Sequence, residues 1–206
     1  MKKLLALLMA AVMLVTLCSG GNETEDDALT PIDPTEATRL VEAFIEAYYL
    51  RDYATQFSLC FYDARGQWED KVIADNGTAE AFFAIAQRQA DEKGIEVVVD
   101  SFDSYYAAYH RFILEDCRSI YGEYTLTVTT TANVKMAADL LPEFRSNLLS
   151  GPAKDYMDAA ALEAIDEVYT VTVNLVIDGE KKDHSEHYLV YAVNHQGQWL
   201  VADYSA

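Results

Sequence analysis

The sequence has little positive charge and few glycines, and both shortages exclude kinds of protein. Its 206 residues include 15 Lys and Arg against 34 Asp and Glu, for a net charge of −19. Nucleic-acid binding depends on Lys and Arg that neutralise phosphates, so this balance argues against a nucleic-acid partner. The 9 glycines form no phosphate-binding loop, and no serine lies in a nucleophile-elbow motif. Nucleotide-binding loops and hydrolases built on that elbow are therefore not expected.

Long apolar runs are also scarce, and the one present is at the N-terminus. Lys2 and Lys3 precede an uncharged, mostly apolar stretch, residues 4–17. This stretch is shorter than the ~20 residues that span a bilayer, and it predicts an export signal over residues 1–17. Residues 18–33 are rich in Gly, Asn, Thr, Asp and Glu and predict a flexible tether about 20 Å long. One folded domain is expected over residues 34–206.

Residues 15–21, Val-Thr-Leu-Cys-Ser-Gly-Gly, resemble the lipobox of bacterial lipoproteins. In that family signal peptidase II cleaves before a cysteine that carries a diacylglyceryl thioether. The resemblance implies lipid attachment at Cys18, a place on the outer face of the cytoplasmic membrane, and contact with the membrane through the lipid anchor alone. The family prefers a small residue where this chain has Leu17, and a secreted chain is the alternative.

The other two cysteines, Cys60 and Cys117, leave two interpretations open. In an exported protein an even pair favours a disulfide. The residues between them provide no geometric test, so two buried free thiols are equally compatible with the sequence. No neighbour of Cys60 in the sequence would activate it as a nucleophile.

Apolar periodicity predicts a series of helices before the last third of the chain. The first begins at Asp33-Pro34, which provide an N-cap and a proline at the first helical position, and it breaks near Arg51-Asp52-Tyr53. Residues 63–76 have no clear period. The other predictions are a short helix over 54–61, helices over 78–93, 104–119, 137–149 and 156–167, a short buried strand over 95–99, and a long strand over 124–135.

The last third predicts a three-strand antiparallel meander. Tyr169, Val171 and Val173 begin an alternation of apolar and polar residues that continues to Ile177. Asp178-Gly179 and Gln196-Gly197 are expected to form tight hairpin turns on either side of a central strand. The fold class is therefore α+β, with long N-terminal helices packed on a curved antiparallel sheet.

Three features together resemble the nuclear-transport-factor-2-like (cystatin-like) superfamily of α+β cones. They are the Arg51-Asp52-Tyr53 break after a long first helix, the hairpin at Asp178-Gly179, and Gly197-Gln198-Trp199-Leu200-Val201 near the end. With the lipobox, the chain resembles lipoproteins of Gram-positive bacteria that carry one such domain outside the cell. In the superfamily the sheet and the helices enclose a pocket, which implies these lining residues: Tyr48, Tyr105, Tyr109, Tyr188 and Tyr191. The aromatic stripe on the 104–119 helix is otherwise expected to be core.

Catalytic and metal-binding residues are not evident. An isomerase-like site would need a buried carboxylate and a tyrosine donor, for which Asp52, Asp100 and Asp103 are the candidates. His184 and His187 are three apart in a predicted strand and so lie on opposite faces, which argues against a shared metal. No cofactor and no metal is expected.

These patterns favour a membrane-tethered extracytoplasmic module that binds a small ligand or another envelope protein without catalysis. The alternatives are a pocket enzyme of the isomerase or hydratase type and a structural envelope protein whose interior is filled by its own side chains. The apolar sheet also leaves a homodimer open.

Overall fold

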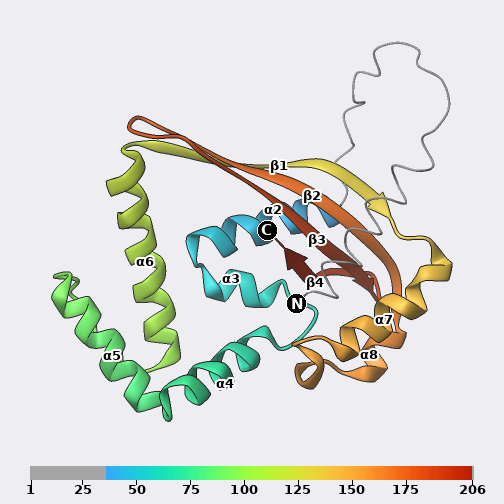
Figure 1. The fold of residues 1–206 in the computed structure, drawn as a ribbon, viewed down its shortest axis with the longest axis horizontal. Coiled ribbons are helices and arrows are strands. Elements are labelled where there is room, and N and C mark those ends of the chain that lie inside the picture. Colours follow the sequence, from blue (N-terminus) through green and yellow to red (C-terminus); the bar gives the residue numbers. More distant parts are fainter. Residues whose placement is uncertain (1–35, 206) are drawn as a thin grey trace. The chain divides into compact units, whose positions relative to one another are not determined.

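The computed structural model divides the chain into two units, Met1–Pro31 and Ile32–Ala206. Residues 36–205 are described here; the predicted signal peptide, Cys18 and the tether lie outside them. No helix within residues 36–205 is long and apolar enough to cross a membrane. The described residues form an α+β domain, which confirms the predicted fold class (Figure 1). Its α-helices are α2 (Glu36–Leu50), α3 (Tyr53–Ser58), α4 (Ala64–Asn76), α5 (Ala79–Glu92), α6 (Phe102–Tyr121), α7 (Leu141–Ser150) and α8 (Ala159–Glu163), with 3-10 turns η1 (Ala138–Leu140) and η2 (Lys154–Tyr156).

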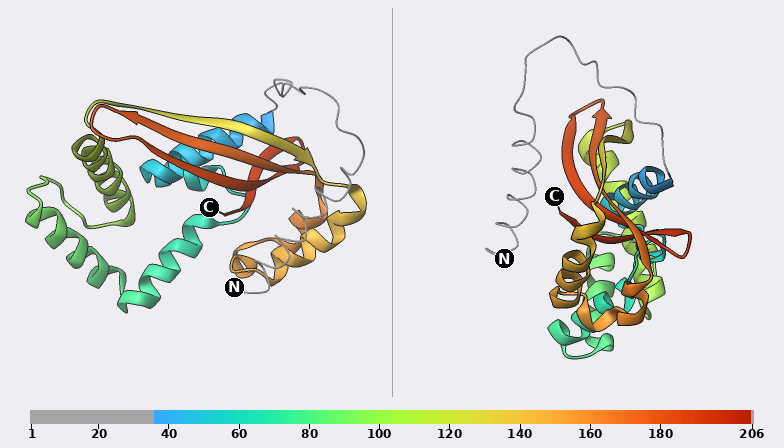
Figure 2. Two further views of the ribbon diagram at one scale, coloured as in Figure 1. Left: turned by 45° about the horizontal axis from the view of Figure 1, so that its top comes forward. Right: turned by 90° about the vertical axis from the view of Figure 1, so that its right-hand side faces the viewer.

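The sheet has four antiparallel strands in the order β1-β2-β3-β4. They are β1 (Tyr124–Lys135), β2 (Ile165–Gly179), β3 (His184–His195) and β4 (Gln198–Ser205). The predicted meander is confirmed as β2, β3 and β4, and the predicted long strand is β1. The strands are long and curve together, as the two views in Figure 2 show.

The main core lies between the sheet and α2. On α2, Val41, Phe44 and Ile45 recur at helical spacing and all have 0% exposure. Opposite them, alternate residues of β2 from Val171 to Ile177 are also fully buried. This core is mostly aliphatic, with Phe44 as the aromatic side chain of α2 in it, and it holds the domain together through apolar burial.

A second core cluster lies at the other end of the sheet, under α7 and α8. Phe144 and Leu148 of α7 and Leu162 of α8 pack on Val168 and Val193. Pro142 lies in the first turn of α7, where the missing N–H has no intrahelical role. The helix predicted over 156–167 is wrong at both ends: α8 begins only at Ala159, and the chain enters β2 at Ile165 to pair with β3.

Both edges of the sheet are engaged by other parts of the chain. At β4, Phe61 donates its N–H to the Val201 carbonyl and the Val201 N–H bonds Leu59, both at 2.8 Å. At β1, a Glu42 carboxylate oxygen accepts the Thr130 N–H at 2.9 Å and the Thr130 hydroxyl at 2.8 Å. That contact falls where the pairing of β1 with β2 is irregular.

The predicted tight turn at Asp178-Gly179 is wrong, because both residues belong to β2 and the loop follows them. Gly179 does not have a positive φ. A Cβ there would lie 2.7 Å from the Lys182 carbonyl oxygen and 2.8 Å from the Tyr121 Cβ. The position therefore needs glycine for close approach of the C-terminal end of α6. The second turn is confirmed: Gln196 and Gly197 have φ values of 53° and 85°.

Candidate functional site

A groove of about 340 Å³ lies between α5, the extended segment 95–99 and α6. This volume falls in the range of small-molecule sites, about 300–1,000 Å³. Its lining is mostly apolar: Ala86, Gln89, Ala90, Glu92, Lys93, Ile95, Val97, Val99, Tyr105, Ala108, Tyr109 and Phe112.

Small side chains explain why α5 and α6 leave a space between them. Ala86 and Ala90 face the groove from α5, and Ala108 faces it from α6. A larger side chain at any of these positions would occupy the volume. The groove thus follows directly from three alanines on two aromatic-rich helices.

The far wall of the groove is the segment that the sequence predicts as a strand, and it belongs to no sheet. The Gln87 side chain takes the place of a strand partner: its amide donates to the Val97 carbonyl at 3.1 Å and accepts the Val99 N–H at 2.8 Å. Ile95, Val97 and Val99 face the groove, while Val98 is 73% exposed. Apolar and exposed residues do alternate in this segment, but its backbone bonds a helix side chain in place of a neighbouring strand.

The mouth of the groove carries charge. The Lys93 ammonium lies 3.4 Å from the centre of the Phe112 ring, a cation–π contact, and Glu92 lies beside it. The groove therefore has an apolar interior and a charged entrance, which suits a ligand with a long apolar part.

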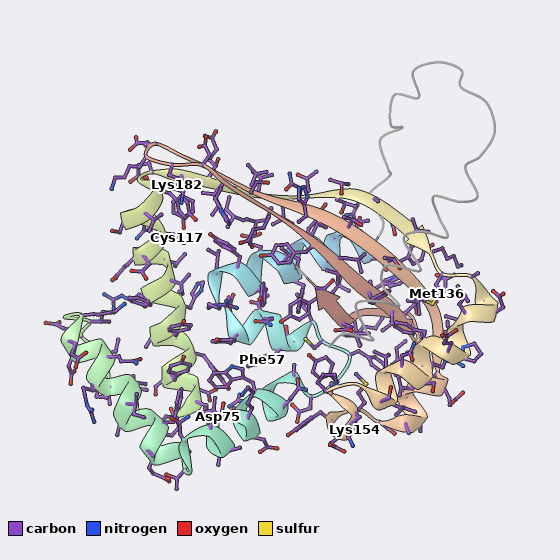
Figure 3. All side chains as sticks on the ribbon, in the orientation of Figure 1. Phe57, Asp75, Cys117, Met136, Lys154 and Lys182 are labelled. Carbon is purple, nitrogen blue, oxygen red and sulfur yellow. The ribbon has the colours of Figure 1, made fainter. Side chains whose placement is uncertain are left out.

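Tyr105 and Tyr109 form the base of the groove and belong to a larger aromatic cluster. Their rings are stacked 5.4 Å apart. Trp68 of α4 stacks on Tyr105 at 5.5 Å, and Tyr53 of α3 stacks on Tyr109 at 6.2 Å. Phe57 of α3 lies beside the cluster between α3 and α4 (Figure 3). Rings from α3 and α4 thus position the two tyrosines of α6.

The elbow between α2 and α3 places Arg51 beside this cluster. The Arg51 N–H bonds the Tyr48 carbonyl at 3.3 Å, and the Asp52 N–H bonds the Ala47 carbonyl at 2.9 Å. This pair of bonds is the Schellman helix ending, in which the residue at Arg51's position is usually glycine. Arg51 has a φ of 55°, a left-handed conformation that costs a side-chain-bearing residue about 1–2 kcal/mol.

One tyrosine contacts the Arg51 guanidinium, and five more interact with it electrostatically. It lies 4.7 Å from the centre of the Tyr48 ring. It also interacts with Tyr53 and Tyr109. Burial raises the pKa of Tyr105, Tyr188 and Tyr204, and the positive charge of Arg51 opposes that rise in each. These hydroxyls therefore stay protonated at neutral pH and can donate hydrogen bonds.

The five tyrosines proposed as pocket lining occupy three places. Tyr105 and Tyr109 line the α5–α6 groove. Tyr48 and Tyr188 pack edge-to-face at 5.9 Å in the main core cluster. Tyr191 packs on Phe144 in the second core cluster, at 5.5 Å. Arg51 interacts with tyrosines of the first two places. Tyr191 is not one of them.

Both cysteines within residues 36–205 are free thiols. The Cys60 Sγ donates to the Gln56 carbonyl at 3.4 Å, and burial raises its pKa to about 12. Cys117 is buried on α6 near the hairpin end of the sheet (Figure 3). The sequence leaves a disulfide and two free thiols open, and the structure has two free thiols.

The three candidate carboxylates make local hydrogen bonds and ion pairs. Asp52 caps α3 by accepting the Thr55 N–H at 3.2 Å. Asp100 accepts a bond from Ser104 at 3.2 Å, and Asp103 pairs with Arg65 at 3.0 Å. No sequence pattern singles out Asp203. Burial raises the pKa of its carboxyl, although the residue as a whole remains exposed.

The two histidines do not come together. His184 pairs with Glu186 at 3.0 Å, while His187 is exposed on the other face of β3. Within residues 36–205 no group of three His, Cys, Asp or Glu side chains could hold a metal ion.

Comparisons with family models, curated proteins and solved structures find no match to this chain. The interpretation of the groove and of Arg51 therefore depends on the structure alone. The sequence pattern marks Arg51 only as part of a helix break; an arginine where a helix ending favours glycine is the signal that could have singled it out.

Proposed function

We propose that this protein is an exported, lipid-anchored binding module whose folded domain holds a small apolar ligand in the α5–α6 groove. The observation that carries the proposal is the groove itself, with a volume of about 340 Å³ and aromatic and aliphatic walls. Apolar clefts of this size with a few polar groups at the edge are the usual form of small-molecule sites.

The sequence supports the cellular side of the proposal. The apolar run of residues 4–17, the lipobox-like stretch ending in Cys18, and the polar tether favour a domain held outside the cytoplasmic membrane. Hydrophobic molecules are abundant near such a surface, so a groove that shields an apolar ligand from water is useful there.

The test uses decanol, a neutral apolar probe, and the fluorescence of Trp68, which stacks on Tyr105. A Trp199→Phe background removes the other tryptophan. Decanol is expected to change the Trp68 emission with saturation. Ala108→Phe, which fills the groove, should abolish the change. Ala107→Phe is the matched control, because Ala107 is the exposed neighbour on the same helix. Saturable binding that survives Ala108→Phe, or no binding at all, would show the proposal to be wrong.

A second candidate function, a pocket enzyme, is favoured by one observation. The Asp203 carboxyl has a pKa raised by burial and interacts with Tyr62 and Tyr191, the pairing of acid and phenol that an isomerase uses. If this candidate is correct, turnover of a β,γ-unsaturated ketone should be measurable and should disappear in Asp203→Asn. Turnover that Asp203→Asn leaves unchanged would reject it.

A further inference from the structure

The lining of the α5–α6 groove carries one charge of each sign, Glu92 and Lys93. Glu92 is the last residue of α5, and Lys93 follows it as the C-cap. Among residues 36–205, no carboxylate lies within 4.0 Å of the Lys93 ammonium, and no cationic nitrogen lies within 4.0 Å of the Glu92 carboxylate. Two neighbouring opposite charges thus line one groove without an ion pair to each other or to another described residue.

The contact with Phe112 holds the Lys93 ammonium at the groove. The ammonium lies 3.4 Å from the centre of the Phe112 ring, and both residues belong to the lining. An ammonium has three N–H donors, and a ring on one side leaves those on the other side free. The Lys93 ammonium can therefore bind an anionic oxygen while it stays on the ring.

The end of α5 favours a positive charge beside that anion. The carbonyls in the last turn of a helix carry a partial negative charge, and this groove is lined by the last turn of α5. The Glu92 carboxylate adds a full negative charge at the same place. A ligand ammonium is stabilised there by both.

A ligand with a single charge meets one favourable and one unfavourable group at this mouth. An anion would in addition enter a chain whose net charge is −19. A cation would meet Lys93 on the ring that could otherwise bind it. A zwitterion with adjacent charges pairs with both Glu92 and Lys93, and it adds no net charge.

The rest of the groove determines what the zwitterion carries. Ile95, Val97 and Val99 form one wall, and Tyr105 and Tyr109 form the base. These residues suit a large apolar group. The volume of about 340 Å³ holds one apolar side chain, but it does not hold the two acyl chains of a zwitterionic phospholipid.

We propose that the ligand of the groove is a free α-amino acid with a large apolar side chain, whose carboxylate binds Lys93 and whose ammonium binds Glu92. This inference rests on the proposed function, because it names the chemical class of the ligand bound in the same groove. An α-amino acid carries its two charges on one carbon, which matches the neighbouring positions of Glu92 and Lys93.

The test compares four compounds that share an apolar chain and differ in the charged end: 2-aminodecanoate, decanoate, decylamine and decanol. Binding is followed at neutral pH by the Trp68 emission of the Trp199→Phe background. The zwitterionic 2-aminodecanoate should bind about tenfold more tightly than each of the other three, because it alone forms two favourable ion pairs at the mouth.

Two variants assign the charges. Lys93→Met should make decylamine the tightest of the four ligands, and Glu92→Gln should make decanoate the tightest. Each affinity is divided by that of decanol in the same variant, so a general change in the groove cancels. Arg88→Gln and Glu80→Gln are the controls: they remove exposed charges of α5 outside the groove lining and should keep the order of the wild-type chain.

The outcomes separate the two proposals. Equal affinity for 2-aminodecanoate and decanol, or tightest binding of a compound with one charge, would overturn the amino-acid site and leave the groove in place. An unchanged order of ligands in Lys93→Met and Glu92→Gln would do the same. No binding of any of the four compounds would overturn both proposals.

Discussion

The sheet with α2 and the helices α4 to α6 are packed in different ways. On α2 and β2, aliphatic side chains such as Val41, Ile45 and Val173 are fully buried. Between α4 and α6 the contacts are mostly between aromatic rings, and Trp68 and Phe82 remain partly exposed. Branched aliphatic side chains fill space closely on a pleated surface. Flat rings in tilted and edge-to-face pairs fill space less closely, and the alanines of α5 and α6 leave the groove beside them.

This contrast separates stability from binding. The aliphatic region can supply most of the free energy of folding, because it removes the most apolar surface from water. The aromatic region then needs only enough packing to keep Tyr105 and Tyr109 in position. Four experiments test that division.

The largest effect is expected from truncating the core between α2 and the sheet. Phe44→Ala should lower the free energy of unfolding by about 3–5 kcal/mol, because it leaves a cavity under the sheet. Phe82→Ala, in the aromatic region, should cost about half as much, since its ring is only partly buried. Urea denaturation followed by circular dichroism measures both. Equal losses would mean that the two regions contribute alike.

The next effect concerns the two thiols. Burial raises the pKa of Cys60 to about 12, so the folded chain holds the thiol proton more tightly than the unfolded chain, where the pKa is about 8.5. At pH 8 its reaction with an aromatic disulfide reagent should be on the order of a hundredfold slower than in the unfolded chain. The stabilising contribution is complete below pH about 8.5 and is lost as the pH rises toward 12.

Cys117 is on α6, so its reaction tests whether the helices α4 to α6 open separately from the sheet with α2. If α6 opens apart from the sheet, Cys117 should react in mild urea before Cys60 does. Cys60→Ser and Cys117→Ser assign the two reactions. Simultaneous reaction of both thiols would show that the regions unfold together.

A smaller loss is expected at the joint between the regions. Gly179→Ala would push a methyl group against Tyr121 of α6 and the Lys182 carbonyl, and should cost about 1–3 kcal/mol. Gly151→Ala is the control: its nearest contact would be 3.3 Å, so it should cost about 0.5 kcal/mol. Thermal unfolding compares the two, and a Gly179→Ala variant as stable as Gly151→Ala would contradict the close packing there.

The smallest effect lies at the mouth of the groove. Lys93→Met keeps the aliphatic stem and removes the charge above Phe112, which should cost about 0.5–1 kcal/mol. Lys71→Met removes only an exposed helical ion pair with Asp75 and should cost about 0.3–0.5 kcal/mol. Identical stability of wild type and Lys93→Met in urea would show that the cation–π contact does not hold the groove wall.

The pattern of the sequence predicted the aliphatic region better than the aromatic one. Alternation from Tyr169 to Ile177 depends only on which residues face a core, and it placed β2 well. The same alternation at residues 95–99 was misleading, because the backbone partner there is the Gln87 side chain. The residues that interact with Arg51 come from α2, α3, α6, β3 and β4. A periodic pattern within one segment cannot predict contacts between segments that are far apart in the sequence.

The contact between Glu42 and Thr130 has a consequence for self-association. An open strand edge is where the sheets of neighbouring molecules join. A strand that paired along β1 at Thr130 would displace Glu42 and leave its carboxylate without these donors. One glutamate from α2 thus protects the β1 edge against sheet-to-sheet polymerisation.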